Sequence, residues 1–242
     1  MLKCENVYKR YGSVVALNNV SIEFRPGEIV GLLGENGAGK TTLMKSILSY
    51  IRLDKGRVTL DGEKIGPHNI ERIAFATSEH SFFGGLNAKE HKAFYQMQFP
   101  RFNEKRFDSL LEFFELSEKI KIKNFSTGQK NQFEVILALS QGADYILMDE
   151  PFAGNDIFNR EDFYKVLLGI LGENECLILS THLIEEIKNF ISRAVLLHKG
   201  QLIGDVTTLE LDENNTDLME YMRRQYSYKA DRVVETLMKN EK

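Results

Sequence analysis

A glycine-rich stretch near the amino terminus constrains the fold of this chain more than any other feature. Residues 34–41 read G-E-N-G-A-G-K-T, and they follow an apolar run at residues 28–33 that predicts a buried strand. Residues 41–48 then have the pattern of a helix. Strand, glycine loop and helix in this order form a unit in which backbone N–H groups and a helix N-terminus surround a phosphate. The segment therefore predicts a nucleotide-phosphate site.

Each position of this loop has an expected role. Its glycines let the backbone curl so that successive N–H groups point at one anion. The ammonium group of Lys40 is expected to bridge the β- and γ-phosphates, and the Thr41 hydroxyl to bind Mg²⁺. The residues predicted to contact the nucleotide here are Gly34, Asn36, Gly37, Ala38, Gly39, Lys40, Thr41 and Thr42. A glycine-rich turn that merely precedes a helix is the alternative, and the strand before the loop argues against it.

A second motif is the apolar run at residues 145–148, which ends in two carboxylates, Asp149 and Glu150, and then Pro151. We expect Asp149 to hold Mg²⁺ directly or through water. Glu150 is expected to act as the general base that polarises the attacking water, a role typically worth ~10²–10⁴ in rate. Two carboxylates that end a strand on a solvated loop are the alternative. The two motifs together predict that the chain binds and hydrolyses ATP, with Lys40 and Glu150 as catalytic residues.

Composition excludes several other classes of protein. The net charge of −4 and the pI near 5.8 argue against a general nucleic-acid binder, which usually carries a basic face. The longest apolar runs are far shorter than the ~20 residues that cross a bilayer. The first residues lack the apolar stretch of a signal peptide, and the two cysteines have no metal-ligand spacing. We therefore expect a chain in the reducing cytosol with no direct membrane insertion.

The first part of the chain predicts a small antiparallel sheet. Residues 2–8, 20–25 and 57–60 read as short strands, and Asp61-Gly62 after the last of them is a strong turn signal.

The later part predicts an α/β core. Buried strands recur at residues 145–148, 176–179 and 194–197, with helical stretches such as 159–171 between them. Strands that alternate with helices indicate a parallel sheet covered on both faces. Apolar residues at helical spacing between about 87 and 139 indicate an inserted helical lobe. The predicted fold class is thus an α/β P-loop NTPase core with a parallel sheet, a small antiparallel β subdomain and a helical lobe. One domain is expected over residues 1–205, with a charged, helical extension at 206–242.

A third motif links the chain to a known family. Residues 125–129 read F-S-T-G-Q and stand before a predicted helix, about 20 residues ahead of Asp149. They resemble, at three of five positions, the L-S-G-G-Q signature of the ATP-binding subunits of ATP-binding cassette (ABC) transporters. With the two motifs above, the resemblance extends over roughly residues 1–205. It implies a head-to-tail dimer in which Ser126, Gly128 and Gln129 contact the γ-phosphate held by the opposing subunit. An ordinary helix cap is the alternative for these residues taken alone.

The resemblance implies roles for further residues. Tyr11 resembles the aromatic residue that stacks on adenine, with a core or surface tyrosine as the alternative. His182, in the sequence S-T-H after a buried strand, resembles the histidine that contacts the γ-phosphate and Glu150. Residues 153–156 resemble the loop through which the two subunits communicate, although Asn155 replaces the usual leucine.

The sequence departs from the family at one metal-contacting position. The family usually has a glutamine there, after a strand that follows the glycine loop. In this chain residues 73–77 lead to Ser78 and then Glu79. Glu79 is the candidate replacement at Mg²⁺, and a solvated loop residue is the alternative.

The resemblance implies a subunit that powers transport through a separate transmembrane permease, at the cytoplasmic face of the cell membrane. ATP and Mg²⁺ are the implied cofactors, and a second cassette, identical or related, is the implied partner. The compact length and Glu79 resemble bacterial drug, peptide or bacteriocin exporters, so we expect export, with import as the alternative. A non-transport ATPase of the same superfamily usually has two cassettes in one chain or long coiled-coil insertions, and neither is seen. A P-loop kinase or nucleotide switch leaves residues 125–129 unexplained.

Overall fold

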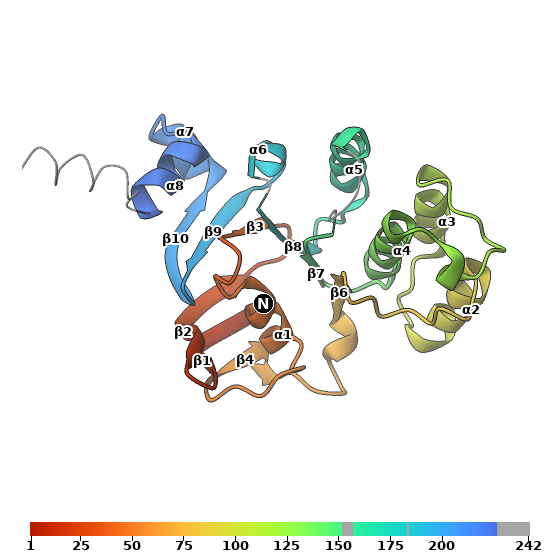
Figure 1. Cartoon of the computed structure of the whole chain (residues 1–242), viewed down its shortest axis with the longest axis horizontal. Helices are drawn as coiled ribbons and strands as arrows, with labels where there is room; N and C mark the ends of the chain where they lie inside the picture. The colour runs from red at the N-terminus through yellow and green to blue at the C-terminus, as the bar shows by residue number, and fades with distance from the viewer. Residues whose placement is uncertain (152–156, 183, 227–242) are drawn as a thin grey trace, which may run out of the picture.

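Two β-sheets form the framework of the computed structural model, which describes residues 1–151, 157–182 and 184–226 (Figure 1). The smaller sheet is antiparallel, has the strand order β2-β1-β4-β5, and consists of β1 (Leu2–Tyr11), β2 (Val14–Phe24), β4 (Lys55–Leu60) and β5 (Glu63–Lys64). The larger sheet has the order β10-β9-β3-β8-β7-β6. Its strands are β3 (Ile29–Leu33), β6 (Ile73–Thr77), β7 (Tyr145–Asp149), β8 (Cys176–Thr181), β9 (Arg193–His198) and β10 (Gln201–Thr207). All neighbours in it are parallel except β10, which pairs antiparallel with β9.

Helices cover both faces of the larger sheet. They are α1 (Lys40–Ile47), α2 (Ala88–Gln98), α3 (Glu104–Phe113), α4 (Thr127–Ser140), α5 (Ile157–Ile170), α6 (Ile184–Ile187), α7 (Thr208–Glu213) and α8 (Leu218–Tyr226), with short 3₁₀ turns at Ile70–Arg72 and Ile122–Asn124. Figure 1 shows α5 and α6 on one side of the larger sheet, and α1 with the smaller sheet on the other. This arrangement, together with the inserted helices α2 to α4, confirms the predicted α/β fold class.

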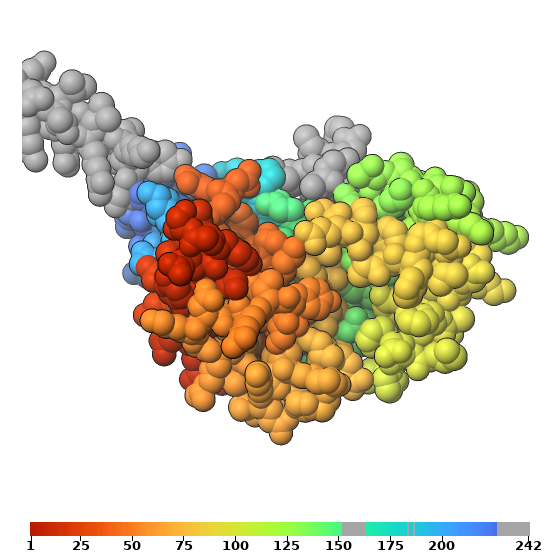
Figure 2. All heavy atoms as spheres, turned by 60° about the horizontal axis from the view of Figure 1, so that its bottom comes forward, coloured from red at the N-terminus to blue at the C-terminus, as the bar shows by residue number. Residues whose placement is uncertain are grey.

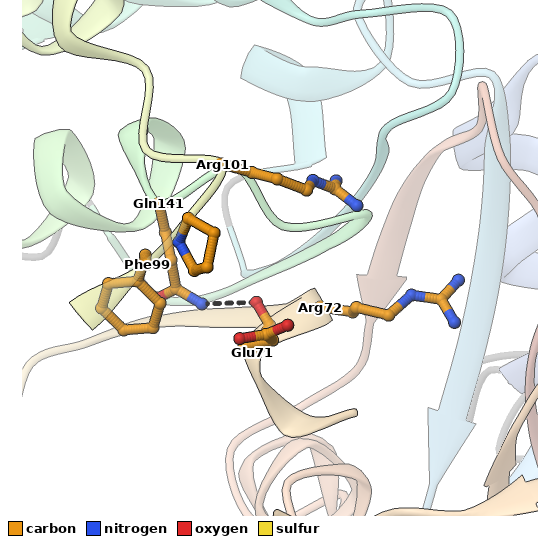
Figure 3. Close-up of a pocket in the computed structure, with 7 residues that line it drawn as sticks. Glu71, Arg72, Phe99, Arg101 and Gln141 are labelled. Carbon is orange, nitrogen blue, oxygen red and sulfur yellow. Dashed lines mark hydrogen bonds between the residues drawn. The ribbon is translucent and has the colours of Figure 1, made fainter. Parts of the chain in front are cut away.

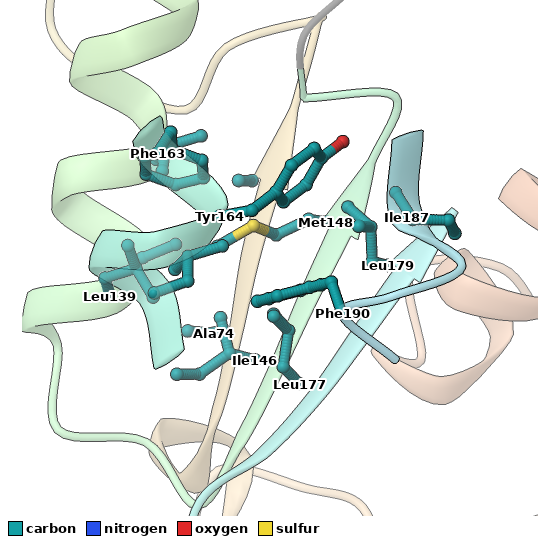
Figure 4. Close-up of a cluster of buried hydrophobic side chains, with 14 of the residues drawn as sticks. Ala74, Leu139, Ile146, Met148, Phe163, Tyr164, Leu177, Leu179, Ile187 and Phe190 are labelled. Carbon is teal, nitrogen blue, oxygen red and sulfur yellow. The ribbon is translucent and has the colours of Figure 1, made fainter. Parts of the chain in front are cut away.

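The alternation of side chains along the central strands explains the two covered faces. On β7, Ile146 and Met148 pack in the cluster that contains Tyr164 of α5 (Figure 4), whereas Leu147 packs in the cluster that contains Met44 of α1. Successive side chains of a strand point to opposite faces, so a strand that is buried on both sides must be apolar throughout. The continuous apolar runs in the sequence therefore mark the centre of the parallel sheet.

The first two strands are longer than predicted. They were expected at residues 2–8 and 20–25, but they run over Leu2–Tyr11 and Val14–Phe24. Asn6 and Asn19 have positive φ angles of 49° and 58°, and the pairing of the two strands shifts register in places. Such bulges interrupt the alternation of apolar and polar residues, and this interruption hid part of each strand in the sequence.

The helical lobe forms one end of the molecule. In Figure 2 its yellow to green residues lie on the right, and the red to orange residues of the amino-terminal part lie on the left. At the other end of the chain, α7 and α8 contact β10. The predicted domain boundary after residue 205 would fall inside β10, and it stays a prediction, as does the helical extension beyond residue 226, which lies outside the described residues. Among the residues that the structure describes, no helix combines the length and the apolar composition needed to cross a bilayer.

Candidate nucleotide-binding and hydrolysis site

The predicted phosphate loop, residues 34–41, connects the end of β3 to α1. Gly37 and Gly39 have φ angles of +80° and +110°, in the region that residues with side chains rarely adopt. A Cβ atom at Gly34 would clash with the carbonyl oxygen of Leu197, and one at Gly39 with that of Ala16. The loop is therefore a curled segment in close contact with Leu197 and Ala16. Its glycines are needed because the backbone adopts positive φ angles and because a side chain at Gly34 or Gly39 would have no room.

The N-terminus of α1 has no side-chain cap, in contrast to those of four other helices. A side chain accepts a hydrogen bond from the first turn of α2, α3, α4 and α7, and these caps are Asn87, Asn103, Ser126 and Thr207. The N-cap of α1 is Gly39, which supplies no such bond, and its first turn has no acidic residue. The N–H groups and the positive end of this helix dipole are thus positioned for an external anion.

The Lys40 side chain folds back onto the start of the loop. Its ammonium group donates to the carbonyl oxygens of Gly34 (2.8 Å) and Glu35 (3.2 Å), and the residue is only 6% exposed. A phosphate chain entering the loop would meet this charge together with the N–H groups of α1, and both favour an anion.

Asp149 lies directly beside the loop although 108 positions separate it from Thr41. The Thr41 hydroxyl donates to Asp149 Oδ2 at 2.6 Å, and the buried Ser180 hydroxyl donates to Asp149 Oδ1. Parallel pairing of β7 with β8 places Asp149 opposite Ser180 at the carboxyl edge of the sheet. The site is thus built from the ends of neighbouring parallel strands.

The donor set at this edge fits a magnesium ion. Thr41 and Asp149 offer hydroxyl and carboxylate oxygens, which are the hard ligands that Mg²⁺ prefers. Within the described ranges, no group of three or more His, Cys, Asp or Glu residues could hold a metal ion. An ion at Asp149 would therefore complete its shell with phosphate oxygens and water, as Mg²⁺ does at nucleotide sites.

Glu150, the predicted base, has a strained backbone. Its φ angle is +48°, and its N–H group donates to both the carbonyl and the hydroxyl oxygen of Ser180, at 3.1 and 3.2 Å. His182 Nδ1 lies 3.1 Å from each carboxylate oxygen of Glu150. Non-glycine residues persist in this conformation only where their surroundings hold them, often at functional sites. The Glu150 and His182 side chains are 26% and 57% exposed, so the pair faces solvent.

The structure places the candidate metal ligand Glu79 in an ion pair. Glu79 follows β6, and its carboxylate lies 2.7 Å from the ammonium group of Lys45, which is one turn after Thr41 on α1. The Glu79 side chain is 71% exposed. Glu79 follows the strand at the same carboxyl edge of the sheet as Asp149, but its carboxylate contacts Lys45. Its role at Mg²⁺ therefore stays a prediction.

Tyr11 lies at the end of the β1–β2 hairpin and is 48% exposed. The Lys9 ammonium group lies 5.1 Å from the centroid of its ring. The same hairpin carries Ala16, whose carbonyl oxygen lies close against Gly39 of the phosphate loop. The ring is thus half-exposed, with the Lys9 ammonium group over it, on a hairpin that packs beside the loop. Its stacking on adenine stays a prediction.

The signature segment belongs to the lobe. The Ser126 hydroxyl accepts from the Gln129 N–H group (3.2 Å), and the Gln129 side chain accepts from the Ser126 N–H group (2.9 Å). These two bonds form a capping box, so the helix-cap interpretation is correct as local structure. Ser126 is exposed and Gly128 half-buried. Contact of this segment with a second subunit stays a prediction, and residues 153–156 lie outside the described residues.

The sequence analysis assigned no role to Ser180, which bridges the two carboxylates of the site. Ser180 is fully buried. Its hydroxyl donates a hydrogen bond to the Asp149 carboxylate and accepts one from the N–H group of Glu150. A hydroxyl residue next to the end of an otherwise apolar strand, two positions before His182, is the sequence signal for its place in the site.

A separate small pocket lies at the opposite edge of the larger sheet (Figure 3). Glu71, Arg72 and Gln141 line it, and the Gln141 amide donates to the Glu71 carbonyl oxygen at 3.0 Å. These residues precede β6 or follow α4, whereas the phosphate loop stands at the carboxyl edge. The pocket is therefore not part of the nucleotide site.

Comparisons with known proteins agree with this geometry. The family model for ABC transporters matches residues 17–153. A "Probable ABC transporter ATP-binding protein" of Azorhizobium caulinodans is 32% identical over 207 residues, which cover 81% of this chain and 73% of that protein. The lipopolysaccharide export system ATP-binding protein LptB of Haemophilus influenzae is 29% identical and covers 93% of this chain and 98% of its own. The bacitracin transport ATP-binding protein BcrA of Bacillus licheniformis is 26% identical, with coverage of 91% and 74%.

A solved structure described as the ATP-binding subunit of an ABC transporter superposes with a TM-score of 0.80 over 94% of this chain and 98% of its own, at 22% identity. This similarity supports the same fold. The family match and the 32% identical relative establish more: the chain belongs to the ATP-binding proteins of ABC transporters and is a nucleotide-binding ATPase of that family.

Proposed function

We propose that this protein hydrolyses ATP to power export through a separate transmembrane permease, and that it works as a dimer of cassettes. The observation that carries the proposal is the meeting of Thr41, Asp149, Glu150 and His182 at the carboxyl edge of the parallel sheet, beside the uncapped N-terminus of α1. Such an edge provides anion binding, a metal ligand and a base within one site.

The residues of this site would divide the reaction among them. Lys40 and the N–H groups of α1 bind the phosphates and hold them in one orientation. Thr41 and Asp149 would hold Mg²⁺, which would supply positive charge to offset that of the phosphates. Glu150 accepts the proton of the attacking water, and His182 holds the carboxylate in place through Nδ1.

The second cassette would complete the site. Ser126 and Gly128 lie at an exposed helix N-terminus, where a phosphate bound by another copy could be contacted. ATP binding would then favour the closed dimer, and hydrolysis would release it, because the two states bind the nucleotide with different affinity. The sequence is compatible with either an identical or a related second cassette.

The permease would bind residues 78–95 and the adjoining face of the lobe. Phe83 lies in this stretch, and it is 54% exposed. The backbone N–H group of Phe83 donates to Nε2 of the fully buried His91 at 3.0 Å. An exposed aromatic side chain on a firmly held backbone is a typical anchor at a protein interface. Attachment through such a surface would place the protein at the cytoplasmic face of the membrane. Export is supported by the similarity to proteins named for lipopolysaccharide export and bacitracin transport, and import is the alternative direction.

Affinity purification from detergent-solubilised native membranes tests this function. The tagged protein should bring down a membrane protein with several spans, whose architecture reports the direction of transport. Phe83→Asp should lose that partner and keep ATP binding. Leu209→Asp is the matched control, because Leu209 is also an exposed apolar residue (67%) but lies on α7, away from the lobe. Recovery only from the soluble fraction, alone or with ribosomes, would contradict the transport role and favour the non-transport ATPase.

A further inference from the structure

The end of β9 and the turn that leads to β10 pack directly against the phosphate loop. The carbonyl oxygen of Leu197 occupies the space that a side chain at Gly34 would need. Leu197 lies near the end of β9, and in the turn that follows, the Gly200 N–H group donates to the carbonyl oxygen of Ala38 at 2.9 Å. The end of β9 thus contacts the loop at its first residue, and the turn contacts it at its fifth. Because both contacts involve backbone, a shift of the turn must move the loop.

Helix α8 contacts the end of β9, next to this turn, through Tyr226. The Tyr226 hydroxyl donates to the carbonyl oxygen of Leu197 at 3.1 Å, and the ring meets His198 edge to face, with centroids 5.3 Å apart. Burial, and then the nearby carboxylate of Glu35, raise the pKa of Tyr226 to about 12, so its hydroxyl remains a donor at neutral pH.

The attachment of α8 to the rest of the protein is limited. Among its described residues, Leu218–Tyr226, only Leu218 and Met222 are buried. Tyr221 contacts the backbone of β10 at Gly204 and Asp205, and Figure 1 shows α8 beside that strand. A helix that buries few residues depends on such tertiary contacts for its stability and opens at low cost.

We propose that Tyr226 is a positioning residue that couples the seating of α8 on β10 to the nucleotide affinity of the phosphate loop. With α8 seated, Tyr226 holds Leu197 against Gly34 and keeps the loop in its curled form. When α8 is displaced, the turn loses this support and the loop binds phosphate less tightly. Coupling of this kind is reciprocal, so a bound nucleotide also stabilises α8. The inference rests on nucleotide binding by residues 34–41.

Two variants of α8 separate this role from a general stabilising one. Tyr226→Phe removes the hydroxyl that reaches Leu197 and keeps the ring. Tyr221→Phe removes a second hydroxyl of the same helix, and this hydroxyl contacts β10 and not Leu197. We expect Tyr226→Phe to weaken the binding of a non-hydrolysable ATP analogue about two- to tenfold, the range of one hydrogen bond. It should raise KM for ATP by a similar factor with kcat at saturation unchanged, whereas Tyr221→Phe should leave both constants at the wild-type value.

Hydrogen exchange in the unmodified chain supplies the reciprocal test. Addition of the analogue should slow amide exchange in residues 218–226. Equal affinity in wild type and Tyr226→Phe, or an affinity loss in both tyrosine variants alike, would overturn the inference, and so would unchanged exchange in α8. If the wild-type protein fails to bind the analogue at all, the site assignment itself is wrong, and the inference falls with it.

Discussion

Thr41 and Asp149 are 108 positions apart in the chain, yet their side chains share a hydrogen bond of 2.6 Å. Thr41 lies in the first turn of the helix that follows the phosphate loop, and Asp149 ends a strand on the far side of β8. The parallel sheet brings them together because the carboxyl ends of its strands share one edge. This pair is the part of the site at which a metal ion and the nucleotide phosphates would meet.

Replacing Asp149 by Asn keeps the shape of this pair and removes its charge. If Asp149 holds Mg²⁺ directly, as proposed, ATPase activity should fall by more than the ~10–100-fold typical of losing an outer partner of a metal site. Activity as a function of Mg²⁺ concentration measures the effect. A variant that needs no more Mg²⁺ than the wild type would contradict the assignment of Asp149 as a ligand.

Ser180→Ala tests the hydroxyl that joins the two carboxylates. Without it, Asp149 loses one hydrogen-bond donor and the N–H group of Glu150 loses one acceptor. We expect activity or Mg²⁺ affinity to fall about 10–100-fold. Ser46→Ala is the matched control, since Ser46 is also a buried serine but bonds only to the Thr42 carbonyl oxygen within α1. Equal losses in the two variants would show that Ser180 acts only on stability.

His182→Ala should lower kcat and leave ATP affinity close to the wild-type value, because the contact of His182 is with Glu150. We expect a loss of about 10–100-fold, at or below the ~10²–10⁴ that a general base contributes. His68→Ala is the control, since His68 also lies near a carboxylate, that of Glu63 at 3.3 Å, on an exposed part of the amino-terminal region. Full activity of His182→Ala would contradict a role for this histidine in orienting the base.

A buried carboxylate outside the nucleotide site predicts a pH dependence of stability. Glu134 of α4 is 2% exposed and accepts two 3.0 Å contacts from the Ser81 N–H group, and burial raises its pKa from the usual 4.5. Between that value and the raised pKa, the folded state binds more protons than the unfolded state. The contribution of Glu134 to stability therefore falls as the pH rises through this window.

Glu134→Gln should lack this pH-dependent loss. Relative to the wild type, its free energy of unfolding should increase as the pH goes from about 5 to about 8, which urea titrations at several pH values would measure. A difference between the two proteins that stays constant with pH would mean that Glu134 has an ordinary pKa in the folded state.

The sequence predicted the parts of this protein that depend on local order. The glycine loop, the strand before it and the helix after it are contiguous, so residues 28–48 predict the phosphate site without knowledge of the rest of the fold. The apolar runs of the central strands likewise predict a sheet buried on both faces, because both faces need apolar side chains.

The contacts made by Ser180, Glu79 and Tyr226 depend instead on distant segments. Strand pairing brings Ser180 against Asp149, and Lys45 determines where the Glu79 carboxylate lies. Tyr226 reaches Leu197 only because α8 packs on β10. Tertiary structure sets such contacts between residues far apart in the chain, so a local sequence pattern does not specify the partner of each of these side chains.

The most direct test of the whole account is the turnover of Glu150→Gln, measured together with its assembly state in the presence of ATP and Mg²⁺. Because the amide keeps the size of the carboxylate but accepts no proton, we predict an ATP-dependent dimer whose hydrolysis is slower than that of the wild type by about 10²–10⁴. Rapid hydrolysis by this variant would contradict the role of Glu150 as the base, and a chain that stays monomeric with ATP bound would contradict the two-cassette mechanism.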